Sequence, residues 1–191
     1  NLTRRLSGIH AAWHFWYAVS FGGESGLRKL GLGGTHPLTQ RYTQESKVVK
    51  IREMEIADYD EVIALWVQTE GMSIRDADSK ESIAIYLKRN PELSFVAEIN
   101  NEIVGAVLVG TDGRRGYLQH LAVSPNFRGR KLGRELVDRA ISSLAKIGIP
   151  KTHLFVYNDN VNAQQFYERL GWFARDEVRM YSFNSSSNSN V

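Results

Sequence analysis

The sequence predicts an α/β fold over residues 48–183, with a mixed sheet that carries helices on both faces. Short apolar segments joined by short loops between residues 93 and 124 indicate an antiparallel meander. A long amphipathic helix then separates the last of these strands from a further strand, and such a crossover places its two strands in parallel. The expected fold is an antiparallel N-terminal meander joined to a parallel strand–helix–strand centre.

The first elements are a strand over residues 48–54 and two helices. Asp58 and Glu61 have the spacing of a capping box, which predicts a helix start there. One apolar face then follows at helical spacing, made of Tyr59, Val62, Ile63 and Trp66. After a polar loop over 70–78, a second helix is expected over about 79–89, and Pro91 ends it because the residue before a proline disfavours helix.

The meander comprises strands over 93–99, 102–110 and 117–124. Asn100 and Asn101 form the first turn, because asparagine tolerates the positive φ that a two-residue hairpin turn requires. Asp112 and Gly113 lie in the second turn, over 111–116. Loops this short favour antiparallel pairing of the strands that they connect.

The C-terminal half alternates helices and strands. Its long helix is indicated by Leu132, Leu136, Val137, Ala140, Ile141 and Leu144, with Gly148 as its C-terminal cap. A strand over 152–157 should lie parallel to the strand over 117–124. A last helix carries Ala163, Phe166, Tyr167 and Leu170 and ends at Gly171. A final strand or hairpin is expected over 172–183.

Composition divides the chain into three regions. Residues 1–47 form a basic extension, rich in glycine and aromatic residues, that we expect to be poorly ordered; residues 184–191 are a polar tail that we expect to be disordered. The extension has six basic and two acidic residues, about +4, so the rest of the +3 chain is close to −1. A body with no net positive charge argues against nucleic acid as a partner.

Neither a membrane span nor cysteine chemistry is expected. The apolar stretch over 9–21 is shorter than the ~20 residues that a span needs, and no clear cleavage site follows it. We therefore expect a cytoplasmic protein that binds no membrane. The chain has no cysteine, which excludes disulfides, a thiol nucleophile and cysteine-ligated metal. No metal cofactor is expected.

The segment between the third meander strand and the long helix has the chemistry of an anion site. It consists of Arg128, Gly129, Arg130, Lys131, Leu132 and Gly133. Glycine lets the backbone approach a ligand closely, and the free N–H groups and dipole of a helix start favour an anion. The segment lacks the glycine pattern of a Walker loop or a dinucleotide-binding loop. It is typical of a pyrophosphate site or of a solvated basic turn.

Two motifs resemble the signatures of the GNAT N-acetyltransferase superfamily. The first runs from Leu121 to Gly133, L-A-V-S-P-N-F-R-G-R-K-L-G, against the family form L-x-V-x-P followed by R/Q-x-x-G-x-G/A. The second has Asn160, Ala163 and Tyr167, then E-R-L-G-W over 168–172. The resemblance covers residues 48–183. The sequence departs from the family at Lys131, where the first motif glycine stands, so the close-packed backbone at that position is in question.

The resemblance implies roles for these residues. The backbone of Leu121, Ala122 and Val123 would pair with the pantetheine arm of acetyl-CoA. The pyrophosphate would lie on the amides of residues 128–133. Asn160 would hold the cofactor arm, cap the following helix, or both.

The resemblance also assigns Tyr167 as the general acid that protonates the departing thiolate. A base must take a proton from the acceptor ammonium. Many family members carry a carboxylate at the position of Gln119, but glutamine cannot act as a base. His120, which titrates near neutral pH, is the candidate base. Glu70, Asp78 and bulk water remain alternatives.

The function implied is transfer of an acetyl group from acetyl-CoA to a primary amine of a small molecule or protein, by direct attack in a ternary complex. A non-catalytic acetyl-CoA sensor and transfer of a longer acyl group are alternatives. The expected partners are acetyl-CoA and an amine acceptor. A homodimer is also expected, because dimers are frequent among proteins with this resemblance.

Overall fold

A computed structural model of the chain describes residues 48–188 and residue 190. Its elements in chain order are β1 (Lys50–Glu53), η2 (Ile56–Asp58), α1 (Tyr59–Val67), η3 (Asp76–Asp78), α2 (Lys80–Arg89), β2 (Phe95–Ile99), β3 (Glu102–Thr111), β4 (Gly116–Val123), η4 (Pro125–Phe127), α3 (Leu132–Lys146), β5 (Thr152–His153) and α4 (Val161–Arg169). The strands of the described region form one sheet in the order β1-β2-β3-β4-β5. Pairing is antiparallel from β1 to β4 and parallel between β4 and β5, which confirms the mixed α/β fold.

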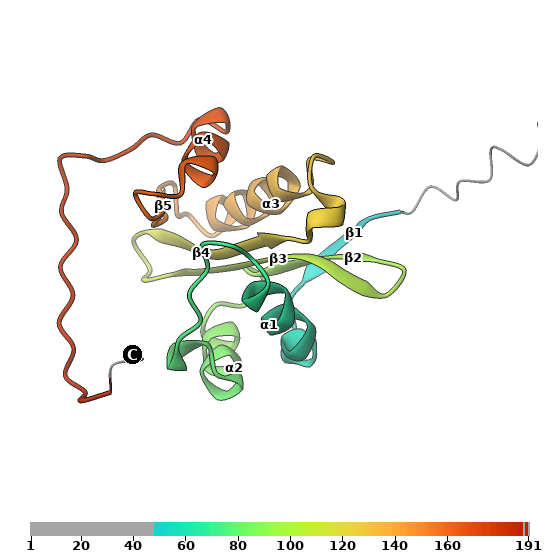
Figure 1. Cartoon of the computed structure of the whole chain (residues 1–191), viewed down its shortest axis with the longest axis horizontal. Coiled ribbons are helices and arrows are strands. Elements are labelled where there is room, and N and C mark those ends of the chain that lie inside the picture. Colours follow the sequence, from blue (N-terminus) through green and yellow to red (C-terminus); the bar gives the residue numbers. More distant parts are fainter. Residues whose placement is uncertain (1–47, 189, 191) are drawn as a thin grey trace, which may run out of the picture. The chain divides into compact units, whose positions relative to one another are not determined.

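Helices cover both faces of the sheet (Figure 1). On one face, α3 and α4 pack over a core that includes Val107, Leu118 and Leu136, here called the α3-side core. On the other, α1 and α2 pack over a core that includes Trp66, Ile83 and Ala106, here called the α1-side core. The apolar face expected on the first helix supplies Val62 and Trp66, which are fully buried.

The capping box predicted for Asp58 and Glu61 does not form. The Asp58 carboxylate is a bidentate acceptor for the Arg52 guanidinium, at 2.7 and 2.8 Å, and also accepts the backbone N–H of Glu55. The Glu61 carboxylate instead accepts the N–H of Ile103 at the start of β3. The prediction was wrong because tertiary partners compete for both carboxylates, and spacing in the sequence does not reveal such partners.

The turns of the meander follow the sequence. Asn100 and Asn101 both have positive φ, 52° and 62°, as the hairpin turn between β2 and β3 requires. At the start of α2, the Ser79 hydroxyl accepts the N–H of Ser82. The asparagine turn forms as predicted because it depends on two adjacent residues, and the Ser79 cap is an additional local feature of the structure.

The strand predicted over 152–157 is confirmed only at its beginning. β5 pairs with β4 at Gly116↔Thr152 and Tyr117↔His153, and regular pairing then ends. Within the part of the chain that the structure describes, the rest of β4 has no strand partner on its β5 side. The two strands therefore begin side by side and lose their pairing toward the C-terminal end of β4, which leaves part of the β4 backbone edge unpaired.

The strand or hairpin predicted over 172–183 is absent from the structure. The segment leaves α4 as an extended chain that bows away from the sheet (Figure 1). It contains a turn, in which Val178 donates its N–H to the carbonyl of Arg175, but no strand pairing. Met180 and Phe183 are 65% and 93% exposed. The prediction was wrong because a strand requires a neighbouring strand to pair with, and this segment has none in the described part of the chain.

The predicted division of the chain is not tested by the structure. Residues 1–47, the expected extension, lie outside the described residues. The disorder expected for 184–191 also stays a prediction. No helix in the described part of the chain is long and apolar enough to cross a membrane.

Candidate functional site

The loop predicted to bind pyrophosphate connects β4 to α3. After the short turn η4, the Arg128 side chain folds back, and its Nε donates to the carbonyl of Val123 at 3.0 Å. The guanidinium of Arg130 lies 5.2 Å from the centre of the Phe127 ring. Both contacts hold cationic side chains beside the end of β4. The loop therefore brings positive charge to the point where the central strand ends and the helix begins.

Lys131 takes the backbone conformation that glycine usually takes. Its φ is 66° and its ψ is 1°, in the left-handed region, and it is the N-cap residue of α3. It makes no side-chain capping bond to the first turn of that helix. The N–H groups of this turn are therefore left without a side-chain cap, which suits them to bind an anion. Lys131, which stands where the family motif has glycine, therefore holds a left-handed backbone conformation that is strained for a residue with a side chain.

Gly133 brings the start of α3 close to α4. A Cβ atom at this position would lie 3.3 Å from the Phe166 ring. At this separation an added Cβ would require the ring to shift slightly, so glycine suits the close approach of the two helices. The contact places the predicted phosphate loop next to the helix that carries Tyr167.

The backbone predicted to pair with the cofactor arm is accessible on one edge. On the β3 side of β4, Leu121, Ala122 and Val123 pair with Val107, Ala106 and Gly105. On the β5 side, strand pairing ends at Tyr117, so these three residues have no strand partner there among residues 48–188. An unpaired strand edge is a template for an added extended chain. The geometry is that of a strand ready to pair with a linear ligand.

A β-bulge in β4 sets which side chains face which core. Val107 pairs with Leu121 but Val109 pairs with Leu118, so β4 contains one more residue than β3 over this stretch. Leu118 and Leu121 consequently both pack on the α3-side core although they are three positions apart. His120, within the bulge, contacts Trp66 of the α1-side core instead.

Tyr167 lies on the α3 side of the sheet. Its ring packs edge-on against Phe166 and Trp172, with centroid separations of 5.1 and 5.7 Å, and it contacts the α3-side core. Burial raises the pKa of its phenol above the ordinary value. The phenol is therefore protonated at neutral pH, which is the form that a general acid requires.

His120 lies on the opposite side and is paired with Asp78. The distance between Nε2 of His120 and Oδ1 of Asp78 is 2.8 Å. The Trp66 ring packs against the imidazole with centroids 4.7 Å apart. Trp66 is fully buried, and its indole N–H has no hydrogen-bond partner within the described residues. Asp78 was an alternative base in the sequence-based prediction, and in the structure it is hydrogen-bonded to His120.

Asn160 caps α4. Its side-chain oxygen accepts the N–H of Ala163 at 3.1 Å. The loop between α1 and α2 comes close to it, because a Cβ atom on Gly71 would lie 2.6 Å from the Asn160 side-chain nitrogen. In the same region the hydroxyls of Ser73 and Tyr157 are 3.3 Å apart. The α1–α2 loop thus extends across to the start of α4. Glu70, the other carboxylate named as a base, is exposed on this loop.

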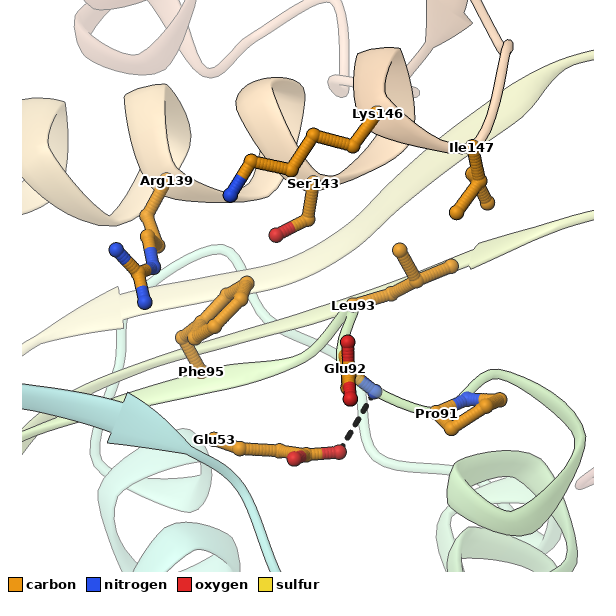
Figure 2. Close-up of a pocket in the computed structure, with 9 residues that line it drawn as sticks. All are labelled: Glu53, Pro91, Glu92, Leu93, Phe95, Arg139, Ser143, Lys146 and Ile147. Carbon is orange, nitrogen blue, oxygen red and sulfur yellow. Dashed lines mark hydrogen bonds between the residues drawn. The ribbon is translucent and has the colours of Figure 1, made fainter.

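A groove of about 240 Å³ lies elsewhere, between the second half of α3 and the β1–β2 side of the sheet. Figure 2 shows cationic Arg139 and Lys146 on its helical wall and the carboxylates Glu53 and Glu92 opposite. It shares no lining residue with the site predicted from the sequence. It is therefore a separate surface feature.

Sequence reasoning missed the supporting partners of His120. Trp66 was assigned to the apolar helical face, and nothing in the sequence connects it to a histidine on β4. Asp78 lies forty-two positions before His120. No local pattern encodes contacts over this separation. The feature that sets the Asp78 carboxylate apart in its polar loop is its burial, and burial is not visible in the sequence.

Comparisons with known proteins give the same family as the motifs. The family model described as "Acetyltransferase (GNAT) family" matches residues 52–172. An acetyltransferase of Pectobacterium atrosepticum is 38% identical over 132 residues, covering 69% of this chain and 93% of that protein. One from Yersinia enterocolitica is 35% identical with the same coverage.

Solved structures show the same fold. The PaiA N-acetyltransferase of Thermoplasma acidophilum, in complex with coenzyme A, superposes with a TM-score of 0.62 at 21% identity, over 68% of this chain and 92% of that one. The aminoglycoside N-acetyltransferase AAC(6')-Iy, also in complex with coenzyme A, gives 0.60 at 18% identity, over 71% and 95%. The family model and the two bacterial relatives establish that the chain belongs to the GNAT family and is an acyltransferase of bacterial type.

Proposed function

We propose that the enzyme transfers the acetyl group of acetyl-CoA to a primary amine by direct attack in a ternary complex. One observation carries the proposal: Tyr167 and His120 lie on opposite sides of the sheet, and β4, which carries His120, has an unpaired edge between residues 118 and 123. Direct transfer needs an acid near the leaving sulfur and a base near the incoming amine. In this proposal Tyr167 serves as the acid and His120 as the base.

The cofactor would lie along the unpaired edge of β4. The backbone of Leu121, Ala122 and Val123 would pair with the amides of the pantetheine arm, and the first-turn N–H groups of α3 would hold the pyrophosphate. The residues fit this role because the edge is free and the helix start has no side-chain cap. Arg128, Gly129, Arg130, Lys131, Leu132 and Gly133 would surround the phosphates.

The proposed steps use His120 and Tyr167, and the proton that His120 takes from the ammonium finally passes to bulk water. His120 takes a proton from the acceptor ammonium, and the neutral amine attacks the thioester carbonyl carbon with its lone pair. The new C–N bond forms as the C–S bond breaks, and the electron pair of that bond leaves with sulfur. Tyr167 donates its phenolic proton to the thiolate, and the surplus proton on nitrogen returns to the phenolate. The chain has no cysteine, so a cysteine acetyl-enzyme is excluded.

An amine acceptor is supported by two further features. Glu70 is exposed on the α1–α2 loop, where its carboxylate favours a cation. Proteins of similar fold include an aminoglycoside acetyltransferase in complex with sisomicin and the NatC complex bound to a Gag peptide and CoA. Aminoglycosides, small diamines and peptides with free amino termini therefore form the first acceptor panel.

Calorimetric titration with acetyl-CoA, beside desulfo- and 3′-dephospho-coenzyme A, tests the cofactor site. We expect saturable binding of one molecule per chain at micromolar concentration. Absence of binding by the folded protein would overturn the proposal. Saturable binding without acetylation of any amine would instead support the sensor alternative, and a preference for succinyl- or propionyl-CoA would support the longer acyl group.

Substitution Tyr167→Phe tests the acid. We expect kcat to fall by about 10²-fold with little change in acetyl-CoA affinity, because the phenyl ring keeps the packing and loses only the proton donor. Tyr181→Phe is the matched control, since Tyr181 is 84% exposed on the C-terminal segment. Steady-state kinetics with the best amine of the panel measure both variants. An unchanged kcat in Tyr167→Phe would remove Tyr167 from the mechanism.

A further inference from the structure

His120 and its neighbours form a cluster whose parts come from three elements. Asp78 ends η3, Trp66 lies in α1, and His120 lies in the bulge of β4. The imidazole is held at Nε2 by the Asp78 carboxylate and against one side by the Trp66 ring. The His120 side chain remains 21% exposed. The imidazole is therefore fixed in direction but still reachable from outside.

Asp78 is itself held from two directions. Its Oδ2 accepts the backbone N–H of Arg75 at 2.9 Å, and its backbone carbonyl accepts the hydroxyl of Tyr59 at 2.9 Å. Burial works to raise the pKa of this carboxyl, but the hydrogen bonds from His120 and the Arg75 N–H hold it below its ordinary value. The side chain is thus a carboxylate at neutral pH, although it is only 8% exposed.

An ionised carboxylate can only accept hydrogen bonds. The short contact between Oδ1 of Asp78 and Nε2 of His120 therefore requires that Nε2 carries a hydrogen. In the neutral imidazole the other ring nitrogen, Nδ1, then has the free lone pair. The geometry determines which nitrogen of His120 can receive a proton.

We propose that Asp78 is the positioning residue of the proton-accepting step: it fixes His120 as the tautomer with hydrogen on Nε2, so that Nδ1 takes the proton of the acceptor ammonium. This inference rests on the proposed acetyl transfer. When Nδ1 gains the proton, the imidazolium lies beside the Asp78 carboxylate, which stabilises the new positive charge. Asp78 itself stays ionised throughout and touches neither substrate.

The charged and titratable neighbours of His120 are few. From η3 it meets Asp78. From α1 it meets the uncharged Trp66, and the phenol of Tyr59 is engaged with the Asp78 carbonyl oxygen. Within the described residues, Asp78 is the acidic side chain that is hydrogen-bonded to His120. Substitution of Asp78 by asparagine therefore removes the negative charge that contacts the imidazole.

Long-range ¹H–¹⁵N correlation spectra of the full-length protein test the tautomer directly. Comparison with His120→Gln assigns the His120 signals among the five histidines of the chain. In the neutral form of the imidazole we expect a pyrrole-type resonance for Nε2 and a pyridine-type resonance for Nδ1. The opposite assignment in the wild-type protein would overturn the proposal, whether or not an acceptor has been found.

Substitution Asp78→Asn tests the kinetic role with the best amine of the panel. The asparagine has nearly the same shape, and its oxygen can still accept the Arg75 N–H. We expect kcat to fall by about 10²-fold, and the acid limb of kcat/KM to move to lower pH, because the imidazolium loses a neighbouring negative charge. Asp76→Asn is the matched control, because it removes the same charge from an exposed position of the same turn and should leave the limb in place.

The outcomes separate this inference from the proposed function. A folded Asp78→Asn variant with an unchanged acid limb would show that Asp78 is only structural, even if acetyl transfer is real. Restoration of the limb by Asp78→Glu would support the positioning role. If the wild-type protein acetylates no amine, the proposed function fails, while the tautomer measured by NMR still decides whether Asp78 orders the imidazole.

Discussion

At the scale of single residues, Lys131 shows how a family position constrains its occupant. The loop before α3 needs a left-handed residue, and a lysine with φ of 66° provides it. The conformation costs an L-residue about 1 kcal/mol or more, because its Cβ approaches the following carbonyl oxygen. Lys131 bears this cost, but next to the predicted phosphate site it also supplies a positive charge that glycine lacks.

Two substitutions separate the strain from the charge. Lys131→Gly removes both, whereas Lys131→Ala removes the charge and keeps the strain. We expect the glycine variant to be more stable than the alanine variant by about 1 kcal/mol, measured by urea unfolding. Both should weaken acetyl-CoA binding to a similar extent in calorimetry. Equal stability of the two variants would show that this backbone is unstrained.

At the scale of elements, the α1–α2 loop and the start of α4 form one assembly. Gly71 approaches the Asn160 side chain, Ser73 approaches Tyr157, and Asp78 holds His120 on β4. The loop is polar and irregular in sequence, but these contacts connect it to two elements of the proposed site. A change in this loop should therefore affect the acceptor side of the reaction more than the overall fold.

The cap of α4 gives a prediction at this scale. Asn160→Ala should cost about 1 kcal/mol of unfolding free energy, because the Ala163 N–H loses its acceptor. Ser79→Ala removes the corresponding cap of α2, far from the proposed cofactor site in the sequence, and should cost a similar amount. Urea unfolding measures both variants.

The matched pair then tests the second role of Asn160. If Asn160 also holds the cofactor arm, only Asn160→Ala weakens acetyl-CoA binding, whereas Ser79→Ala leaves it unchanged. Equal affinities in both variants would restrict Asn160 to its capping role.

At the scale of the described region as a whole, the C-terminal segment exposes more apolar surface than an isolated chain should. Val178, Met180 and Phe183 are 59%, 65% and 93% exposed. Apolar side chains gathered on one extended segment favour association, and the far edge of β5 has no strand partner in the described region. Both features agree with the homodimer expected from the resemblance, which stays a prediction.

Replacement of Val178, Met180 and Phe183 by serine tests this prediction. We expect the wild-type protein to sediment as a dimer at micromolar concentration and the triple variant to shift toward the monomer, because less apolar surface is removed from water on association. Val48→Ser with Ile147→Ser is the control, since these side chains are 78% and 57% exposed on other elements. A wild-type protein that stays monomeric at all concentrations would contradict the prediction.

Local features of this protein were determined by the sequence alone. The asparagine turn, the amphipathic helix over 132–146 and the two family motifs each depend on neighbouring residues, so their patterns are visible in the sequence. The family, the mixed sheet and the candidate residues Tyr167 and His120 follow from these patterns.

The tertiary structure decided the contacts over long separations. In the structure the Asp58 carboxylate binds Arg52 and does not cap α1. A bulge lies at His120, and Asp78 and Trp66 contact the imidazole of His120. The tertiary structure also ended the β4–β5 pairing after two residue pairs and left residues 172–183 without a strand partner. Strand pairing and burial depend on which distant segments meet in space, and no local pattern specifies that choice.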